Sequence, residues 1–217
     1  MVLSNRKWSI FIRQHVLLFV LYFVPSSGSK IGYAQYKEQS NVYEISHGDR
    51  KIGTLVAIMI SDGKKKVYRL ETHVDVKMVF SVKADVVVRN TFIDEILSEA
   101  SAKRVVNNSL KLNNSILRHG EEYRMTTKDQ ETLIHQGVIR KCVSQLYFEE
   151  PLNQTSLFSE AFLAYVPLVK AGKSTYELKL PDGKRNQYTY SEGLCKFITI
   201  ETQLSSVNLK LVASSVK

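Results

Sequence analysis

Residues 174–212 constrain the fold most, because apolar and polar side chains alternate along them in runs that are separated by turn residues. Successive side chains of a β-strand point to opposite faces, so this alternation indicates strands with one packed and one solvated face. Pro181, Asp182 and Gly183 supply turn chemistry between two runs, and Glu192-Gly193 repeats the signal. The sequence therefore predicts a four-stranded antiparallel meander.

An earlier stretch, residues 51–61, is apolar on both faces from Thr54 onward. This pattern fits a central strand that is covered on both sides, with a buried helix as the rival interpretation. The β-branched residues and the nearby Gly53 favour the strand. Asp62-Gly63 then predicts a hairpin turn.

Residues 68–80 alternate without interruption and are predicted to form the longest strand of the chain. At about 3.3 Å per residue this strand is too long for a flat sheet in a small domain, so we expect it to bend near Ser81 and continue through residues 82–94. Long, curled antiparallel strands are typical of barrels and half-barrels.

Helical periodicity is weak throughout, and only residues 138–145 and 156–165 are expected to be helical. The predicted fold class is all-β, with a single antiparallel up-and-down barrel that is open or half-closed. It should contain about ten strands and one or two short helices, all within one domain of residues 35–217. Uneven strand lengths argue against a transmembrane barrel.

Residues 1–34 have the order of a secretory signal peptide, with a basic start, an apolar run at 15–24 and small residues before a cut after Ala34. The alternative is an uncleaved anchor, but Arg13 interrupts that span and the apolar run is shorter than the ~20 residues that a bilayer requires. We expect export to the periplasm or the extracellular space, with or without association with the envelope, and no transmembrane segment after cleavage.

The net charge of +9 is partly a property of this leader, which contains basic residues and no acidic ones. Lys64-Lys65-Lys66 is the densest basic cluster, and it follows the predicted Asp62-Gly63 turn. A solvated hairpin tip explains it better than a nucleic-acid groove, which would combine clustered cations with stacking aromatic rings. No nucleic-acid partner is expected, and contact with anionic lipid or polysaccharide is only weakly indicated.

Cys142 and Cys195 are the two cysteines of the chain. Export would permit a disulfide, but two buried free thiols are the preferred interpretation. No two histidines have the sequence spacing that is typical of metal ligands, so neither a metal nor another cofactor is expected. The usual catalytic signatures of hydrolases, zinc proteases and nucleotide-binding enzymes are also missing.

A few residues remain as candidates for a binding site. Tyr176, Tyr188 and Tyr190 share the packed face of the meander and are predicted either to line a ligand cavity or simply to pack. Glu149 precedes Glu150 and Pro151, and Glu160 follows nearby. Neighbouring carboxylates on an extended chain point apart, so a structural role is favoured over catalysis.

The order of several motifs resembles a family of exported bacterial proteins known only as a domain of unknown function. The motifs are YEI at residues 43–45, KIGTL at 51–55, YFEEP at 147–151, FSE at 158–160 and LPDGK at 180–184. The resemblance covers most of the chain after the leader. It implies an antiparallel, barrel-like β fold and an envelope location, and it supplies no catalytic or ligand-binding residues.

Three functions are consistent with these observations. The first is a non-catalytic binding module for a lipid or another apolar or amphipathic small ligand, held in the trough that curled strands would form. The second is a structural or assembly protein of the cell envelope, in which the trough is only the core. The third, least favoured, is a hydrolase that uses the carboxylates of Glu149, Glu150 or Glu160.

Overall fold

The computed structural model describes residues 36–77, 81–201 and 206–217, which form an almost purely β structure. The strands are β1 (Lys37–His47), β2 (Arg50–Ser61), β3 (Lys65–Lys77), β4 (Ser81–Ile93), β5 (Ile96–Val106), β6 (Ser109–His119), β7 (Glu122–Thr126), β8 (Thr132–Gln136), β9 (Ser156–Ser159), β10 (Ala164–Gly172), β11 (Thr175–Lys179), β12 (Arg185–Ser191), β13 (Leu194–Glu201) and β14 (Ser206–Val216). One 3-10 helix, η1, spans Val143–Tyr147. The predicted all-β class is confirmed, with more strands than expected.

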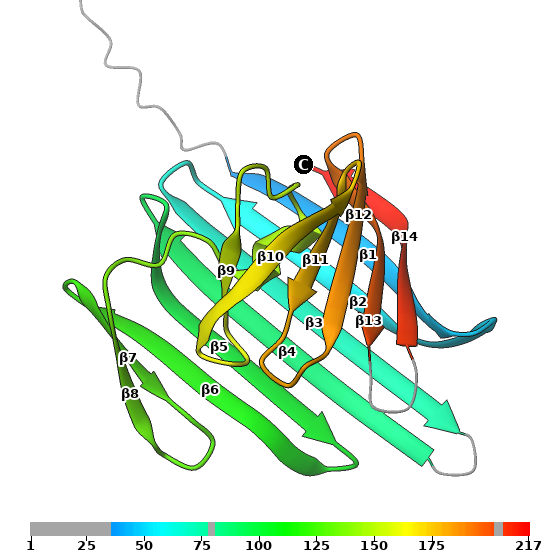
Figure 1. The fold of residues 1–217 in the computed structure, drawn as a ribbon, viewed down its shortest axis with the longest axis horizontal. Coiled ribbons are helices and arrows are strands. Elements are labelled where there is room, and N and C mark those ends of the chain that lie inside the picture. Colours follow the sequence, from blue (N-terminus) through cyan, green and yellow to red (C-terminus); the bar gives the residue numbers. More distant parts are fainter. Residues whose placement is uncertain (1–35, 78–80, 202–205) are drawn as a thin grey trace, which may run out of the picture. The chain divides into compact units, whose positions relative to one another are not determined.

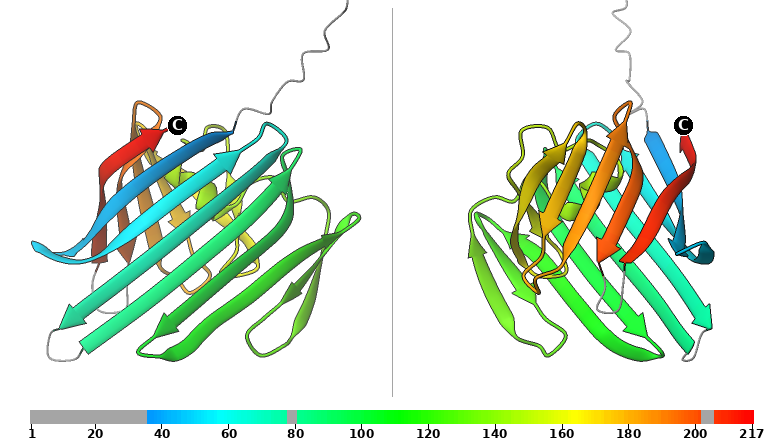
Figure 2. Two further views of the ribbon diagram at one scale, coloured as in Figure 1. Left: turned by 180° about the vertical axis from the view of Figure 1, so that it is seen from behind. Right: turned by 45° about the vertical axis from the view of Figure 1, so that its right-hand side comes forward.

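All of these strands belong to one sheet in which the neighbours are consecutive in the chain at every place but one. The exception is β1, which pairs with β14 and places Ile45 opposite Leu209. Strands β8 and β9 form the two edges of the sheet and do not pair with each other. The sheet is therefore an up-and-down barrel that is open between β8 and β9, and it curls so that β10–β13 face β2–β5 (Figures 1 and 2).

The meander predicted for residues 174–212 is confirmed as strands β11 to β14. Tyr188 and Tyr190 of β12 are buried, and the residues that flank them are more exposed. The turn between β12 and β13 holds Glu192 at φ 54° and Gly193 at φ 75°. Two successive positive φ angles are what a two-residue hairpin with a type I′ turn requires, so the weaker of the two turn signals was also correct.

The prediction of one long strand that bends at Ser81 is wrong. Strands β3 and β4 form an antiparallel hairpin in which Lys77 pairs with Ser81 and Leu70 pairs with Val88. Met78 and Phe80, which were assigned to the long strand, lie outside the described residues. The apolar positions have the same parity before and after Ser81, so periodicity alone does not separate a bent strand from a reversal.

The two predicted helices also need correction. The helical interval lies at Val143–Tyr147, a few residues later than the predicted 138–145. Residues 156–165 contain no helix, because β9 and the start of β10 occupy them and Phe158 pairs with Tyr165. Leu157 and Phe158 are both buried, at 2% and 0% exposure, so burial on two faces removes the alternation that would have indicated a strand.

The helix η1 lies inside the curled sheet (Figure 2). Side chains from the strands bond to its carbonyl groups. The Tyr190 hydroxyl donates to the carbonyl of Leu146 at 2.7 Å, and Asn41 Nδ2 donates to the carbonyl of Tyr147 at 2.8 Å. The Tyr43 hydroxyl lies 3.2 Å from the same Tyr147 oxygen. The last carbonyls of a helix have no hydrogen-bond partner within the helix. These strand side chains supply the partners and hold η1, hereafter the plug, inside the curled sheet.

The segment that joins β8 to β9 crosses the opening of the sheet. The Leu97 amide of β5 donates to the carbonyl of Ile139 at 2.9 Å, and the Phe158 amide of β9 donates to the carbonyl of Lys141 at 3.0 Å. The His135 ring of β8 packs against the Phe158 ring at 5.9 Å. Backbone bonds and ring contacts therefore connect the two edges, although β8 and β9 do not pair.

Other expectations from the sequence have different outcomes. The predicted signal peptide, residues 1–34, lies outside the described residues. Within the described ranges, no helix has the length and apolar character to cross a membrane.

Cys142 and Cys195 are both buried and free, which confirms the preference for two thiols. Burial raises the pKa of the Cys195 thiol to about 12 and that of Cys142 well above its usual value, so neither favours the reactive thiolate.

Candidate ligand-binding cavity

The curled sheet encloses an open cavity of about 820 Å³ beside η1. Residues from β1 to β6 line one side of it, and residues from β11 to β14 line the opposite side. The helix η1 and the turn that follows β9 contribute the remaining walls. The cavity therefore occupies the part of the interior that the plug does not fill.

The long walls of the cavity are apolar. Leu55, Leu70 and Val88 line it from β2, β3 and β4, and Leu178 and Leu209 line it from the facing strands β11 and β14. The alternation of each strand directs one set of side chains inward, so paired strands present a continuous apolar surface. These walls would favour contact with hydrocarbon over contact with water.

A buried polar cluster interrupts the apolar lining where the cavity meets η1. Glu160, in the turn after β9, is 4% exposed and accepts hydrogen bonds at Oε1 from Asn90 Nδ2 and from the Ser144 amide. Asn90 Nδ2 also lies 2.6 Å from Ser144 Oγ. Asn114 Nδ2 of β6 donates to the carbonyl of Ala161 at 2.9 Å and holds the turn against the inner face of the sheet.

Burial raises the pKa of Glu160 above its ordinary value of 4.5, against the opposing effect of the hydrogen bonds from Asn90 and Ser144. Among the described residues, none of the ion pairs includes Glu160. A carboxylate in an apolar site with no cation beside it is costly, so the neutral acid is favoured. Burial also raises the pKa values of the Tyr147 and Tyr188 phenols, which line the same cavity.

We expect the Glu160→Gln variant to show less loss of stability at high pH than the wild type. A raised pKa means that the folded protein holds the proton more tightly than the unfolded chain. The contribution of Glu160 is therefore fully present below the unfolded pKa of 4.5 and is lost as pH rises through the higher folded pKa. Relative to Glu160→Gln, the free energy of unfolding of the wild type should fall by about 1.4 kcal/mol for each pH unit between the unfolded-state and folded-state pKa values of Glu160.

Urea unfolding of both proteins between pH 4 and 9 measures this difference in free energy of unfolding. Glu192→Gln is the matched control, because Glu192 lies exposed in the turn between β12 and β13. Parallel stability curves for the wild type and Glu160→Gln across the whole range would contradict a raised pKa at Glu160.

Charged residues line the cavity on its solvent-exposed side. Lys184 Nζ pairs with Asp182 Oδ2 at 2.5 Å, and Glu201 pairs with Arg185 at 3.2 Å. Arg104 is exposed and takes part in none of the ion pairs between described residues. The cavity thus has a charged rim, an apolar middle and the buried cluster around Glu160 at its inner end.

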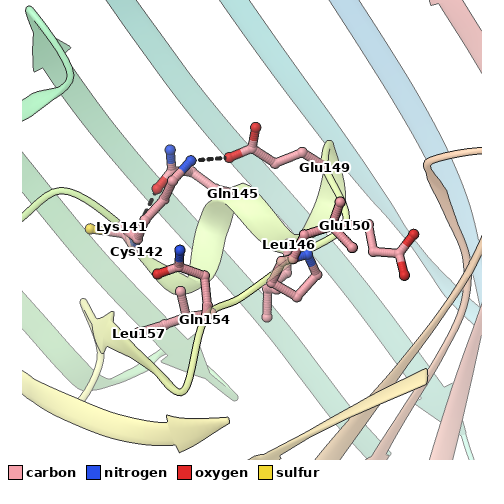
Figure 3. A pocket seen from close by; sticks show the side chains of 10 residues that line it. Lys141, Cys142, Gln145, Leu146, Glu149, Glu150, Gln154 and Leu157 are labelled. Carbon is pink, nitrogen blue, oxygen red and sulfur yellow. Dashed lines mark hydrogen bonds and ion pairs between the residues drawn. The ribbon is translucent and has the colours of Figure 1, made fainter. Parts of the chain in front are cut away.

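A second, smaller pocket of about 100 Å³ lies beside η1 (Figure 3). Lys141 Nζ pairs with Glu149 Oε1 at 2.5 Å at its wall. Glu150 points in a different direction, and its Oε1 accepts a hydrogen bond of 2.9 Å from the Tyr176 hydroxyl (Figure 3). Both carboxylates therefore have structural partners, and the pocket is too small for more than a few atoms.

The structure separates the five residues that the sequence proposed for ligand binding. Tyr188 and Glu160 line the large cavity, whereas Glu149 lines the small pocket. Tyr176 and Tyr190 are buried and pack edge to face, with ring centroids 5.8 Å apart. The assignment of all five residues to a binding site stays a prediction, and Tyr176, Tyr190 and Glu149 also make structural contacts.

The proposed catalytic carboxylates do not face one another, because Glu149 and Glu150 point in different directions and have different partners. Glu149 and Glu150 line the small pocket, and Glu160 lines the large cavity. Hydrolysis by a carboxylate pair requires both groups to flank one substrate bond. The geometry therefore offers no carboxylate pair for such a reaction.

Sequence reasoning missed Asn90 and Ser144, which complete the buried cluster. Asn90 occupies an inward position of β4, between the apolar residues Val88 and Phe92. The sequence did contain a signal for Asn90, because it is a polar residue on an otherwise apolar face of its strand. Ser144 carried no comparable signal, because it belongs to η1 and reaches the cavity only through the tertiary fold.

Comparisons with known proteins identify a family and a solved structure of similar fold. A family model described as a domain of unknown function, DUF6134, matches residues 43–212. A crystal structure of a beta-barrel-like protein of the domain of unknown function DUF1849 from Brucella abortus is similar, with a TM-score of 0.52 and 12% sequence identity. The similarity covers 85% of this chain and 100% of that one, and it concerns the fold alone. No curated protein matches the chain.

Proposed function

We propose that this chain, which belongs to the DUF6134 family of unknown function, is a non-catalytic binding protein that holds an apolar or amphipathic small ligand in its cavity. The observation that carries the proposal is the open cavity of about 820 Å³ with apolar walls. Small-molecule sites usually measure ~300–1,000 Å³ and combine apolar walls with a few well-placed polar groups. Both properties are present.

The packing of the rest of the interior supports the same proposal. Protein cores are normally packed as densely as organic crystals, and an unfilled apolar volume forfeits dispersion contacts. Here the plug fills only part of the interior, and Leu70 and Leu178 face the space that is left. A hydrocarbon group in this space would gain about 25 cal/mol for each Å² of apolar surface removed from water.

The order of residues 1–34 supports export, and export would bring the protein into contact with the molecules of the cell envelope. We therefore propose that the ligand is a lipid or another amphipathic molecule of that compartment. The alternative role, a structural or assembly protein of the envelope, would leave the cavity without an occupant.

Filling the cavity with a larger side chain should weaken ligand binding. Val86 of β4 lines the cavity and pairs with Thr72 and Arg104 on the neighbouring strands. We expect Val86→Trp to weaken the binding of an apolar fluorescent dye at least about tenfold, which is 1.4 kcal/mol, because the indole ring occupies the ligand volume. A fluorescence titration of the purified protein measures this affinity.

Val87→Trp is the matched control, because Val87 is the next residue of β4 and lies on the outer face at 39% exposure. It should leave the dye affinity within about twofold. Native mass spectrometry of gently purified wild type should also show a bound small molecule that Val86→Trp lacks. A ligand-free mass, together with equal dye binding by both variants, would contradict the proposal and favour the structural role.

A further inference from the structure

The polar groups of the cavity are sorted by depth. The charged groups that line it, such as Arg104 and Asp182, are on exposed residues at the rim. The polar groups at the inner end belong to Ser144, Ser159 and Glu160, which are 1%, 4% and 4% exposed. Apolar walls separate the two sets, so a ligand that fills the cavity places one end against each.

The inner groups have unused hydrogen-bonding capacity. Ser144 Oγ accepts from Asn90 at 2.6 Å, and Ser159 Oγ accepts from the Phe162 amide at 3.4 Å. The Ser144 hydroxyl gives its proton to the Glu160 carboxyl. The Ser159 hydroxyl is only an acceptor among the hydrogen bonds of the described residues, so its proton can be donated to an oxygen of a ligand.

A second observation is a buried acceptor within the same cluster. Asn90 is 0% exposed, and its Oδ1 atom has no partner among the described residues. Its Nδ2 atom holds Glu160 and Ser144 together. Buried polar atoms are nearly always paired, so a cluster that holds an unpaired acceptor and a free hydroxyl proton on Ser159 is incomplete without another polar group.

The charges of the groups around Glu160 decide which kind of polar ligand group fits the inner end of the cavity. The groups around the Glu160 carboxyl are the Asn90 amide, the Ser144 amide and hydroxyl, and the phenols of Tyr147 and Tyr188. None of these surrounding groups carries a formal charge at neutral pH, and burial shifts Glu160 toward its neutral form. An ionised end group would lose its hydration here without meeting an opposite charge, whereas an uncharged one would not.

We infer that the cavity takes an amphipathic ligand polar end first, and that this end is an uncharged hydroxyl or amide seated against Ser144, Ser159 and Glu160. This inference rests on the proposed function and specifies the chemical class of the ligand. A hydroxyl both donates and accepts, so it can receive the Ser159 proton and donate to the Glu160 carboxyl in one position. The apolar body of the ligand then lies along Leu70 and Leu178.

Three probes of one chain length test the inference in the full protein. They are decan-1-ol, decanoate and decylammonium, each used at pH 7.5 to displace the apolar dye. We expect the alcohol to bind at least about tenfold more tightly than either ion, which is the size of effect that one buried hydrogen-bonding mismatch produces. Equal affinities, or a preference for decanoate or decylammonium, would overturn the inference.

Two substitutions assign the preference to the cluster. Glu160→Gln keeps a neutral hydrogen-bonding group of the same shape and should retain the preference for the alcohol. Glu160→Leu should reduce the affinity for the alcohol about tenfold and leave the dye affinity within about twofold, because the apolar walls remain. An unchanged alcohol preference in Glu160→Leu would overturn the role of the cluster.

Other readouts keep the two proposals separable. If Glu160→Leu does not fold, Ser159→Ala removes the available hydroxyl donor and should reduce the preference for the alcohol by at least about threefold. An unchanged preference in that variant would count against the inference. If the probes bind without preference but Val86→Trp blocks them all, the inference fails and the proposed function stands. If Val86→Trp blocks none of them, the proposed function fails.

Discussion

Replacing Gly53 with alanine is expected to destabilise the fold by about 3 kcal/mol or more, which is more than most single substitutions cost. Gly53 lies in β2, where it pairs with Ile45 on one side and with Val74 on the other. A Cβ atom added there would lie 2.2 Å from the carbonyl oxygen of His73 and 2.9 Å from Cα of Val74. Both contacts are with backbone atoms of β3, so no side chain can rotate away to relieve them.

Urea unfolding measures the change, and Gly172→Ala is the matched control. An added Cβ at Gly172 would approach only the Thr175 side chain, at 3.7 Å, which is an ordinary contact. That substitution should change the free energy of unfolding by no more than about 0.5 kcal/mol. If the two variants unfold at the same urea concentration, the close approach of β2 and β3 at Gly53 is not a constraint on the fold.

Replacing Asn41 with leucine should destabilise the protein by about 2–4 kcal/mol, the second-largest effect we expect. Asn41 is 0% exposed and joins two elements of the structure. Its Nδ2 atom donates to the carbonyl of Tyr147 at 2.8 Å, and its Oδ1 atom accepts from the Ser214 hydroxyl at 2.7 Å. Leucine would leave both partners buried without a full set of hydrogen bonds, although it favours a strand at least as well as asparagine does.

The control for this prediction is Asn208→Leu on the neighbouring strand β14. Asn208 is exposed, and its Oδ1 atom accepts from the Thr199 hydroxyl at 3.1 Å. Its loss should cost less than about 1 kcal/mol. Amide exchange should separate the variants further, because the amide of Phe148 after η1 should exchange faster in Asn41→Leu and not in Asn208→Leu. Unchanged protection in both would mean that Asn41 does not fix the plug.

The sequence predicted those parts of the fold in which one face of a strand is packed and the other is solvated. Tyr188 and Tyr190 alternate with polar neighbours, so β12 was recognisable without the structure. The same rule failed at Leu157 and Phe158, where both faces are buried and the alternation disappears. It also failed between Lys77 and Ser81, because a reversal of the chain keeps the apolar parity. Local periodicity reports burial, and it does not report which strand lies opposite.

The site was predictable in outline only. Alternation in residues 68–74 indicated an apolar face, and a curled sheet implied a trough. The polar end of the cavity was not predictable, because Ser144 and Glu160 meet only after η1 and the turn after β9 have entered the barrel. The recognisable signal was asparagine at inward strand positions, namely Asn41, Asn90, Asn114 and Asn186. The first three bond to the plug or to the turn after β9.

The pairing of β1 with β14 has a consequence for how the protein acquires its structure. These strands are neighbours in the middle of the sheet, yet they come from opposite ends of the described chain. During synthesis each half of the sheet can form from local hairpins, but the pairing of β1 with β14 must wait for the last strand to emerge. Until then β1 and β13 present bare edges that could pair with other chains. The slow, aggregation-exposed step of folding should therefore be the joining of the two halves, since it has the greatest sequence separation.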